Sequence, residues 1–247
     1  MKKAPLCIVF PMGIEAYPFL HRVEVRRRWT KNKAVYREAF FEGNSLLIIR
    51  SGIGPARAAA AVQSLEIRPS AILSVGTAGG LVSNSRIRDV VVASETVFKD
   101  QPHNILKCAE ELVRTAAEAC SLEGLRFCVA RVATSPKAII NIKERHQLHE
   151  LTGGHAVDME SHAVALEAAK IGVPFSAIRV ISDDITSAPF PEPRMYKELW
   201  QRPAQFMSIF PAILKWTRFI REFRKSIEVL PPALLRVIRN FEKVRNL

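Results

Sequence analysis

The chain has 247 residues, 48% of them hydrophobic and 24% charged, and its formal net charge at pH 7 is +12. This length can bury a sizeable core in one large domain or two small ones, and the composition excludes a disordered or fibrous chain. The four cysteines have no CxxC spacing, so we expect reduced, packed thiols and neither a disulfide framework nor a metal site. The longest stretch without charges, residues 69–85, contains three glycines, which argues against a membrane span.

The N-terminal segment MKKAPLCIVFPMGI has a basic start and an apolar run, as a signal peptide does. However, Glu15 follows at once and no small-residue cleavage site is present. We therefore interpret the run as a first buried strand and expect a cytoplasmic protein.

Apolar strand-like runs alternate with helical patterns along the chain. The predicted strands are residues 6–10, 46–50, 71–75, 90–92, 127–132 and 175–181, and the predicted helices are residues 55–65, 105–119, 142–149 and 161–172. Such alternation predicts a mixed or largely parallel sheet with helices on both faces. A proline-rich connection after residue 187 predicts a main domain, residues 1–190, and a C-terminal extension, residues 191–247.

The stretch VDMESHAVALEAAKIGVPFSAIRVISDDIT, residues 157–186, combines an acidic cluster, a helix and a strand that ends in two aspartates. Ligands of open α/β sheets bind beyond the carboxyl ends of the strands, where Asp183 and Asp184 would lie. Because strand side chains alternate, Arg179 and Asp183 are predicted to point the same way. The stretch therefore predicts either an acid site or a structural Arg179–Asp183 ion pair with a simple chain turn.

Two glycine-bearing loops each follow a predicted strand. In SGIGPAR, from residue 51, the backbone at Gly54 and the side chain of Arg57 could face an anion at a helix N-terminus, although taken alone the motif is better explained by a plain tight turn. In VGTAGGL, from residue 75, Gly79 allows a ligand to approach the backbone and Thr77 offers a hydroxyl. A structural loop is the alternative here too.

Together these segments resemble the nucleoside phosphorylase and nucleosidase superfamily, and in particular its methylthioadenosine/S-adenosylhomocysteine nucleosidase branch. The resemblance rests on MGIEA at residues 12–16, SGIGPARAAAA, ILSVGTAGGL, RDVVVASE, and VDMES with IRVISD, in the family's order. It implies a three-layer α/β/α fold on a twisted mixed sheet, to which this chain adds the predicted basic, amphipathic, helical C-terminal extension. Family members are usually dimers or larger, so we expect a homodimer.

The resemblance implies roles at the base and the sugar. Breaking the bond between a purine and ribose leaves positive charge on the sugar and negative charge on the base, so one must be shielded and the other protonated. Asp183 matches the acid that protonates the departing purine, Glu160 the carboxylate that binds the ribose hydroxyls, and Met159 a side chain against sugar and base. The same motifs place Ser182 and Gly79 at the substrate.

The resemblance also bears on the attacking group. Glu15, in MGIEA, matches the glutamate that activates water in hydrolases, and Arg179 and Thr77 match residues that hold that water. Phosphorolytic relatives have arginines in the first loop and at the position of Ser74, and a carboxylate at Glu15 would repel phosphate. This favours hydrolysis with water as nucleophile and no cofactor. Arg57 keeps phosphorolysis, with phosphate as co-substrate, as the alternative.

One departure concerns the substrate. Hydrolases that act on methylthioadenosine carry an aromatic residue where this chain has Lys137, in ATSPKAIIN. The segment VDMESHAVA is similar to the sequences of the hopanoid-biosynthesis branch. This resemblance implies removal of adenine from a lipid-linked 5′-substituted adenosine such as adenosylhopane. We therefore expect a nucleosidase that releases adenine from a 5′-substituted adenosine.

The C-terminal tail carries most of the charge. Residues 194–247 contain 12 Lys/Arg and 4 Asp/Glu, a net +8 of the chain's +12. Apolar residues recur every three or four positions from Phe206 to Ile227, which predicts a basic amphipathic helix, and Pro231 and Pro232 separate it from a second helix. Such helices bind anionic membranes or cover their own domain or a partner subunit. No motif suggests nucleic-acid binding. For the location, the alternative to a free cytoplasmic protein is one bound peripherally to the inner face of the membrane. For the function, the alternative to an enzyme is a non-catalytic peripheral membrane protein.

Overall fold

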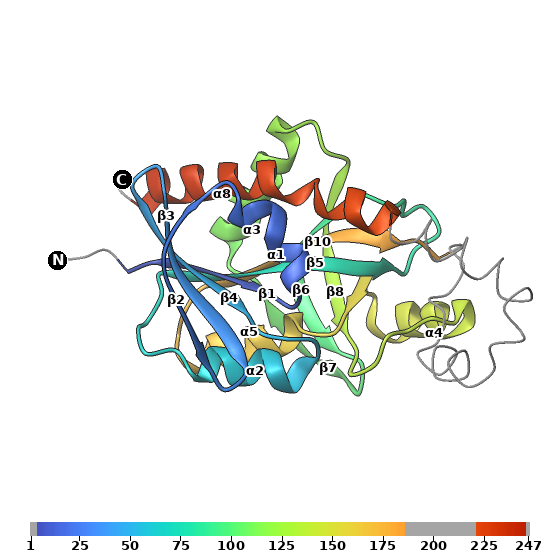
Figure 1. The fold of residues 1–247 in the computed structure, drawn as a ribbon. Coiled ribbons are helices and arrows are strands. Elements are labelled where there is room, and N and C mark those ends of the chain that lie inside the picture. The colour runs from blue at the N-terminus through green and yellow to red at the C-terminus, as the bar shows by residue number, and fades with distance from the viewer. Residues whose placement is uncertain (1–3, 186–220, 246–247) are drawn as a thin grey trace, which may run out of the picture.

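The computed structural model describes residues 4–185 and 221–245 (Figure 1). Its strands form one mixed sheet in the order β10-β6-β8-β9-β5-β1-β4-β3-β2, with β7 paired to β6. The strands are β1 (Leu6–Phe10), β2 (Glu24–Lys31), β3 (Ala34–Phe41), β4 (Asn44–Arg50), β5 (Ala71–Gly80), β6 (Val90–Phe98), β7 (Gln101–Lys107), β8 (Phe127–Thr134), β9 (Ala156–Asp158) and β10 (Phe175–Asp183). The mixed sheet confirms the sequence prediction.

Five of these strands close into a ring, which the sequence did not predict. β10 pairs with β6 and also with β5, and β5 continues through β9 and β8 back to β6. The remaining strands, β1, β4, β3 and β2, extend from β5 as an open wing. The carboxyl ends of parallel β1, β4, β5 and β10 therefore lie at one end of the sheet, beside the ring.

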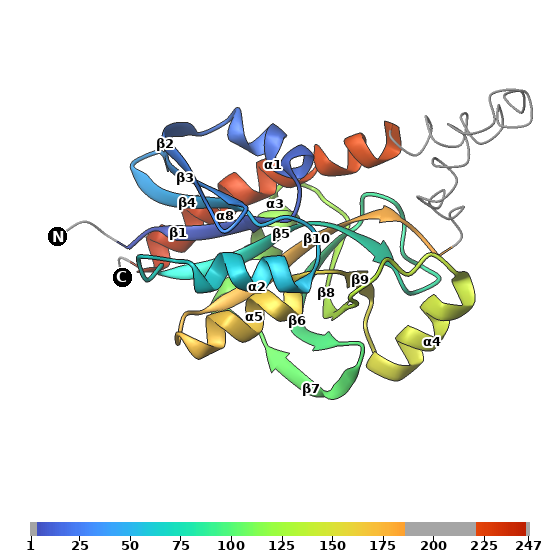
Figure 2. The same ribbon diagram turned by 60° about the horizontal axis from the view of Figure 1, so that its bottom comes forward.

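Helices cover both faces of the sheet, which gives the predicted three layers (Figures 1 and 2). On one face, α1 (Gly13–Leu20), α3 (Glu110–Leu122) and α8 (Leu230–Arg245) share a buried cluster with alternate residues of β1, β4, β5 and β6. On the other, α2 (Pro55–Gln63) and α5 (Ser161–Lys170) pack on the intervening residues. The last helix, α4 (Ile142–Thr152), contributes Leu148 to a third, smaller cluster.

Three sequence predictions need correction. The helix expected at residues 105–119 is strand β7 followed by α3, because the apolar residues 105–106 pair with β6. The hairpin of β2 and β3 was not predicted, since β2 is a highly charged edge strand without a clear alternation. Among the cysteines, Cys7 and Cys120 are buried as expected, whereas Cys128 is exposed.

The described part of the C-terminal extension packs on the main domain. Residues 221–227 are helical, a turn at residues 228–229 follows, and α8 begins at Leu230. The break therefore lies just before the predicted position, and Pro231 and Pro232 stand in the first turn of α8. Leu234 and Val237 of α8 are buried in the cluster shared with α1 and α3. Arg239 adds an ion pair at 2.5 Å with Glu42. This part of the tail therefore covers its own domain.

The first part of the predicted amphipathic helix, residues 206–220, lies outside the described residues. Of the helices in residues 4–185 and 221–245, none has the length and apolar character needed to cross a membrane. The boundary at residue 190 stays a prediction.

Candidate active site

A cavity of about 410 Å³ opens at the carboxyl ends of β1, β5 and β10. Its wall combines the start of α1, the end of β5, the turn from β9 into α5, the end of β10, the segment before α4, and Phe223 of the tail. The lining residues are Pro11, Met12, Ile14, Glu15, Ile53, Thr77, Ala78, Gly79, Lys137, Ala138, Ile139, Ile140, Arg145, Val157, Asp158, Met159, Glu160, Ser182, Asp183 and Phe223. Seven of the ten residues predicted for the site therefore lie around one cavity. The other three are Gly54, Arg57 and Arg179.

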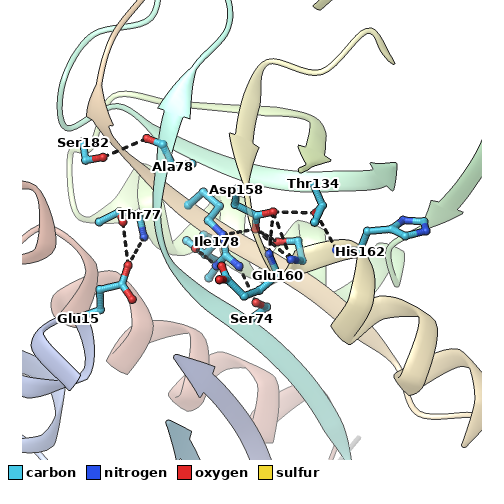
Figure 3. A network of polar contacts seen from close by, with 12 residues as sticks. Glu15, Ser74, Thr77, Ala78, Thr134, Asp158, Glu160, His162, Ile178 and Ser182 are labelled. Carbon is cyan, nitrogen blue, oxygen red and sulfur yellow. Dashed lines mark hydrogen bonds and ion pairs between the residues drawn. The ribbon is translucent and has the colours of Figure 1, made fainter. Parts of the chain in front are cut away.

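Glu15 lies in the first turn of α1 and is almost completely buried. One carboxylate oxygen accepts hydrogen bonds from the Thr77 backbone N–H at 2.7 Å and from the Thr77 hydroxyl at 2.8 Å (Figure 3). The other oxygen accepts the Met12 N–H at 2.9 Å. A Cβ atom on residue 76 would lie 2.9 Å from this carboxylate, so Gly76 allows the approach. Burial raises the pKa of Glu15, an effect that the bonds from Thr77 only partly offset.

Glu160 is the residue before the first turn of α5 and is 5% exposed. Its Oε1 accepts the Gly54 N–H at 2.7 Å. The backbone that was predicted to hold an external anion therefore binds the protein's own carboxylate. Burial, followed by repulsion from Asp158, raises the pKa of Glu160 to about 8. Arg57, the other predicted anion ligand, is exposed and folds over Gly52 instead of lining the cavity.

The raised pKa of Glu160 gives a prediction for stability. A buried carboxyl that ionises only near pH 8 in the folded protein, but near 4.5 when unfolded, costs stability as the pH rises between these values. We expect the free energy of unfolding of the wild type to fall relative to Glu160→Gln by up to about 1.4 kcal/mol per pH unit from pH 5 to pH 8. Denaturant unfolding at several pH values measures this slope. The exposed Glu24→Gln control should show none, and a pH-independent difference for Glu160→Gln would contradict the assigned shift.

Arg179 lies beneath the cavity and is completely buried. Its Nε donates to Asp158 Oδ2 at 2.7 Å, and its Nη2 donates to Ser74 Oγ at 2.6 Å. Asp158 also accepts the Thr134 hydroxyl at 2.7 Å, and this network fixes the turn that presents Glu160 (Figure 3). The structure thus places Arg179 behind the acidic wall, without a direct contact to the cavity.

The predicted Arg179–Asp183 ion pair is wrong. The pairing of β10 with β5 shifts register between Ile181 and Asp183, which breaks the strand alternation on which the prediction depended. Asp183 instead forms an ion pair with Arg145 of α4, and its other oxygen accepts the Ser182 hydroxyl at 2.7 Å. A Cβ atom on residue 79 would lie 3.2 Å from both partners of this pair, so Gly79 leaves room for it.

Arg145 is a residue of the site that sequence reasoning missed. Besides Asp183, its guanidinium bonds the backbone oxygens of Ile139 at 2.9 Å and Asp184 at 2.9 Å. It therefore joins the segment before α4 to the end of β10. The available signal was helical spacing, because Arg145 shares the buried face of α4 with Leu148 and Thr152.

Removing Arg145 should destabilise the protein. Its side chain is 8% exposed, so Arg145→Gln leaves the Asp183 carboxylate without its charged partner in a mostly buried position. We expect a loss of about 3 kcal/mol in the free energy of unfolding, measured by denaturant titration. Arg114→Gln on α3 is a matched control, because the Arg114–Glu111 pair is exposed to solvent and its loss should change the free energy of unfolding far less. Equal effects of the two variants would show that the Arg145 pair is not structural.

The remaining predicted residues have simpler places. Met159 and Ser182 both line the cavity, as does Lys137 at the position where an aromatic residue was expected. The wall is largely apolar apart from the carboxylates of Glu15, Asp158, Glu160 and Asp183 and the side chains of Arg145 and Lys137. In the described part of the chain, no three His, Cys, Asp or Glu side chains are grouped so as to hold a metal ion.

A closed five-stranded ring with an open wing, helices on both faces, and carboxylates at the strand ends define a phosphorylase-type α/β protein. A model of the phosphorylase superfamily matches residues 5–193, and the chain belongs to this family. Among curated relatives, the 5′-methylthioadenosine/S-adenosylhomocysteine nucleosidase of Geobacillus thermodenitrificans is 30% identical over 163 residues, which cover 58% of this chain and 68% of the relative.

Solved structures show the same fold. The futalosine hydrolase of Helicobacter pylori superposes with a TM-score of 0.77 at 20% identity, covering 96% of this chain and 98% of that one. The 5′-methylthioadenosine/S-adenosylhomocysteine nucleosidase of Campylobacter jejuni gives a TM-score of 0.77 at 18% identity, covering 95% and 98%. At these identities the likeness concerns the fold.

Proposed function

We propose that the protein is a nucleosidase that hydrolyses the N-glycosidic bond of a 5′-substituted adenosine and releases adenine. The observation that carries this proposal is Glu15, a buried carboxylate with raised proton affinity that is held by three hydrogen bonds in the wall of a cavity with three further carboxylates. The related nucleosidase from Geobacillus supports the same reaction class.

In the proposed reaction, Glu15 takes a proton from water as the water oxygen bonds to C1′ of the ribose. The bond between C1′ and the purine nitrogen breaks, and its electrons leave with the base, which Asp183 protonates. Glu160 binds the ribose hydroxyls, and its ionised form offsets the positive charge that develops on the sugar. Arg179 favours the ionised forms of Glu15 and Glu160 from below. Water is the nucleophile, so the reaction needs no cofactor.

The position of Arg145 adds a condition for Asp183. In the structure both oxygens of Asp183 accept hydrogen bonds, one from Arg145 and one from Ser182. The purine must therefore replace one of these donors when Asp183 delivers its proton. Arg145 lines the same cavity and is placed to donate to the base when it carries negative charge.

The cavity also bears on the 5′ substituent. Ile53 and Ile14 line it and are 49% and 45% exposed, and Ile140 and Phe223 add further apolar surface. These side chains support an apolar 5′ group, and we propose a lipid-linked adenosine such as adenosylhopane.

We also propose a cytoplasmic homodimer with a catalytic domain of residues 1–190 and an extension of residues 191–247 that reaches the inner face of the membrane. The basic composition of the extension supports this last point.

Product analysis tests the reaction and the substrate together. We expect free adenine from a 5′-alkyl adenosine at the same rate with and without phosphate, and a slower reaction of inosine. The rates measured with methylthioadenosine and S-adenosylhomocysteine then show which 5′ groups the protein prefers. Strict phosphate dependence with a sugar 1-phosphate product would establish phosphorolysis instead, and no turnover of any adenosine would favour a non-catalytic protein. Arg57 does not line the cavity, which speaks against phosphorolysis.

A further inference from the structure

Three arginines gather on one face of the open wing, outside the cavity described above. Arg28 of β2 lies directly opposite Arg37 of β3, and Arg37 lies opposite Ile48 of β4. Arg50 is two residues beyond Ile48 and therefore shares its face, diagonal to Arg37. These three residues are called the arginine triad below. Ile48 packs in the cluster that includes α1, so the triad faces the same side as α1.

The triad lacks counter-charges. Within residues 4–185 and 221–245, no hydrogen bond or ion pair involves the guanidinium groups of Arg28, Arg37 or Arg50, and Arg37 Nη1 is buried without a partner. The neighbouring arginines of the same strand differ, because Arg26 pairs with Glu24 at 2.9 Å and Arg27 with Glu38 at 3.7 Å. The unpaired charges are thus specific to one face of the hairpin.

This arrangement is costly unless an anion completes it. Burial, together with the positive charges of Arg28 and Arg50, lowers the pKa of Arg37. Like charges directly opposite on neighbouring strands are destabilising, and a buried guanidinium N–H without an acceptor adds a desolvation cost. Both costs fall when an oxyanion accepts hydrogen bonds from the group.

We propose that the arginine triad binds a phosphate group. Guanidinium groups match phosphate through paired N–H donors, and several around one point select a dianionic or diester phosphate over chloride. The site lies at the rim of the cavity but is distinct from it. Arg50 Cδ is 3.7 Å from the Cβ position of Gly13, which begins α1, yet none of the three arginines lines the cavity. The ligand is free phosphate or the phosphate of a lipid headgroup.

Thermal unfolding of the full-length protein in phosphate, against chloride of equal ionic strength, tests the free ligand. We expect phosphate at ten times its Kd to raise the melting temperature of the wild type by about 3 to 6 °C. Arg37→Met and Arg28→Met should lose most of this rise. Arg28 is exposed, so its variant keeps the test decisive if Arg37→Met does not fold. Arg27→Met removes the same charge from the same strand and should keep the rise.

Sedimentation with vesicles tests the lipid source. If the site takes headgroups, phosphatidylglycerol vesicles should bind the wild type and Arg27→Met, with about fivefold weaker binding of Arg28→Met, and phosphatidylcholine vesicles should bind none. A loss specific to the triad in either assay supports the proposal and identifies the source. It is overturned if neither phosphate nor anionic vesicles act on the wild type, or if Arg27→Met and Arg28→Met respond equally.

Discussion

Asp183→Asn should lower the turnover of a 5′-substituted adenosine by about 10²- to 10⁴-fold. The amide matches the carboxyl in size and can still accept the bond from Arg145, so the cavity should keep its shape. It cannot deliver the proton that the departing purine needs. Adenine release measured at saturating substrate, together with substrate affinity measured separately, should show a fall in kcat with little change in binding.

The neighbouring aspartate provides a control for this prediction. Asp184→Asn makes the same chemical change one residue further along, but Asp184 does not line the cavity, and Arg145 contacts its backbone oxygen. Its turnover should stay within a few-fold of the wild type. Full activity of Asp183→Asn, or equal losses in both variants, would remove Asp183 from the mechanism.

The sequence was most informative where a residue sits at a fixed distance from a strand end. Glu15, Thr77 and Glu160 each lie within a few residues of a predicted strand or helix boundary, and the structure brings all three to one cavity. Because parallel strands end at the same edge of a sheet, local spacing was enough to place these side chains together. Their chemical roles remain proposals.

The failures arose where contacts depend on long-range packing. Arg145 and Asp183 are 38 residues apart in sequence, and their pairing follows from how α4 docks on the end of β10. The register shift in β10 turned Asp183 away from Arg179, and a short sequence pattern carries no signal for such a shift. Likewise, the ring closure needs β10 to pair on both edges, which an alternation of strands and helices does not reveal.

Glu15→Gln should separate catalysis from stability, because its two effects have opposite signs. We expect hydrolysis to fall by about 10²- to 10³-fold, since the amide cannot take a proton from water. Burial raises the pKa of Glu15, so its ionised form costs folding free energy as the pH rises above the unfolded value. The variant should therefore gain stability relative to the wild type between pH 5 and pH 8, as measured by denaturant unfolding. A loss of activity with a loss of stability would instead indicate a disrupted cavity.

An anionic nucleophile can distinguish the role of Glu15 from that of Asp183. Azide needs no deprotonation, and Glu15→Gln removes the carboxylate that would repel it from the wall of the cavity. Adding azide should therefore restore adenine release in Glu15→Gln, with a glycosyl azide as the second product. It should not restore Asp183→Asn, whose defect lies in the departing base. Rescue of both variants, or of neither, would contradict the division of labour between a base at the first helix and an acid at the last strand.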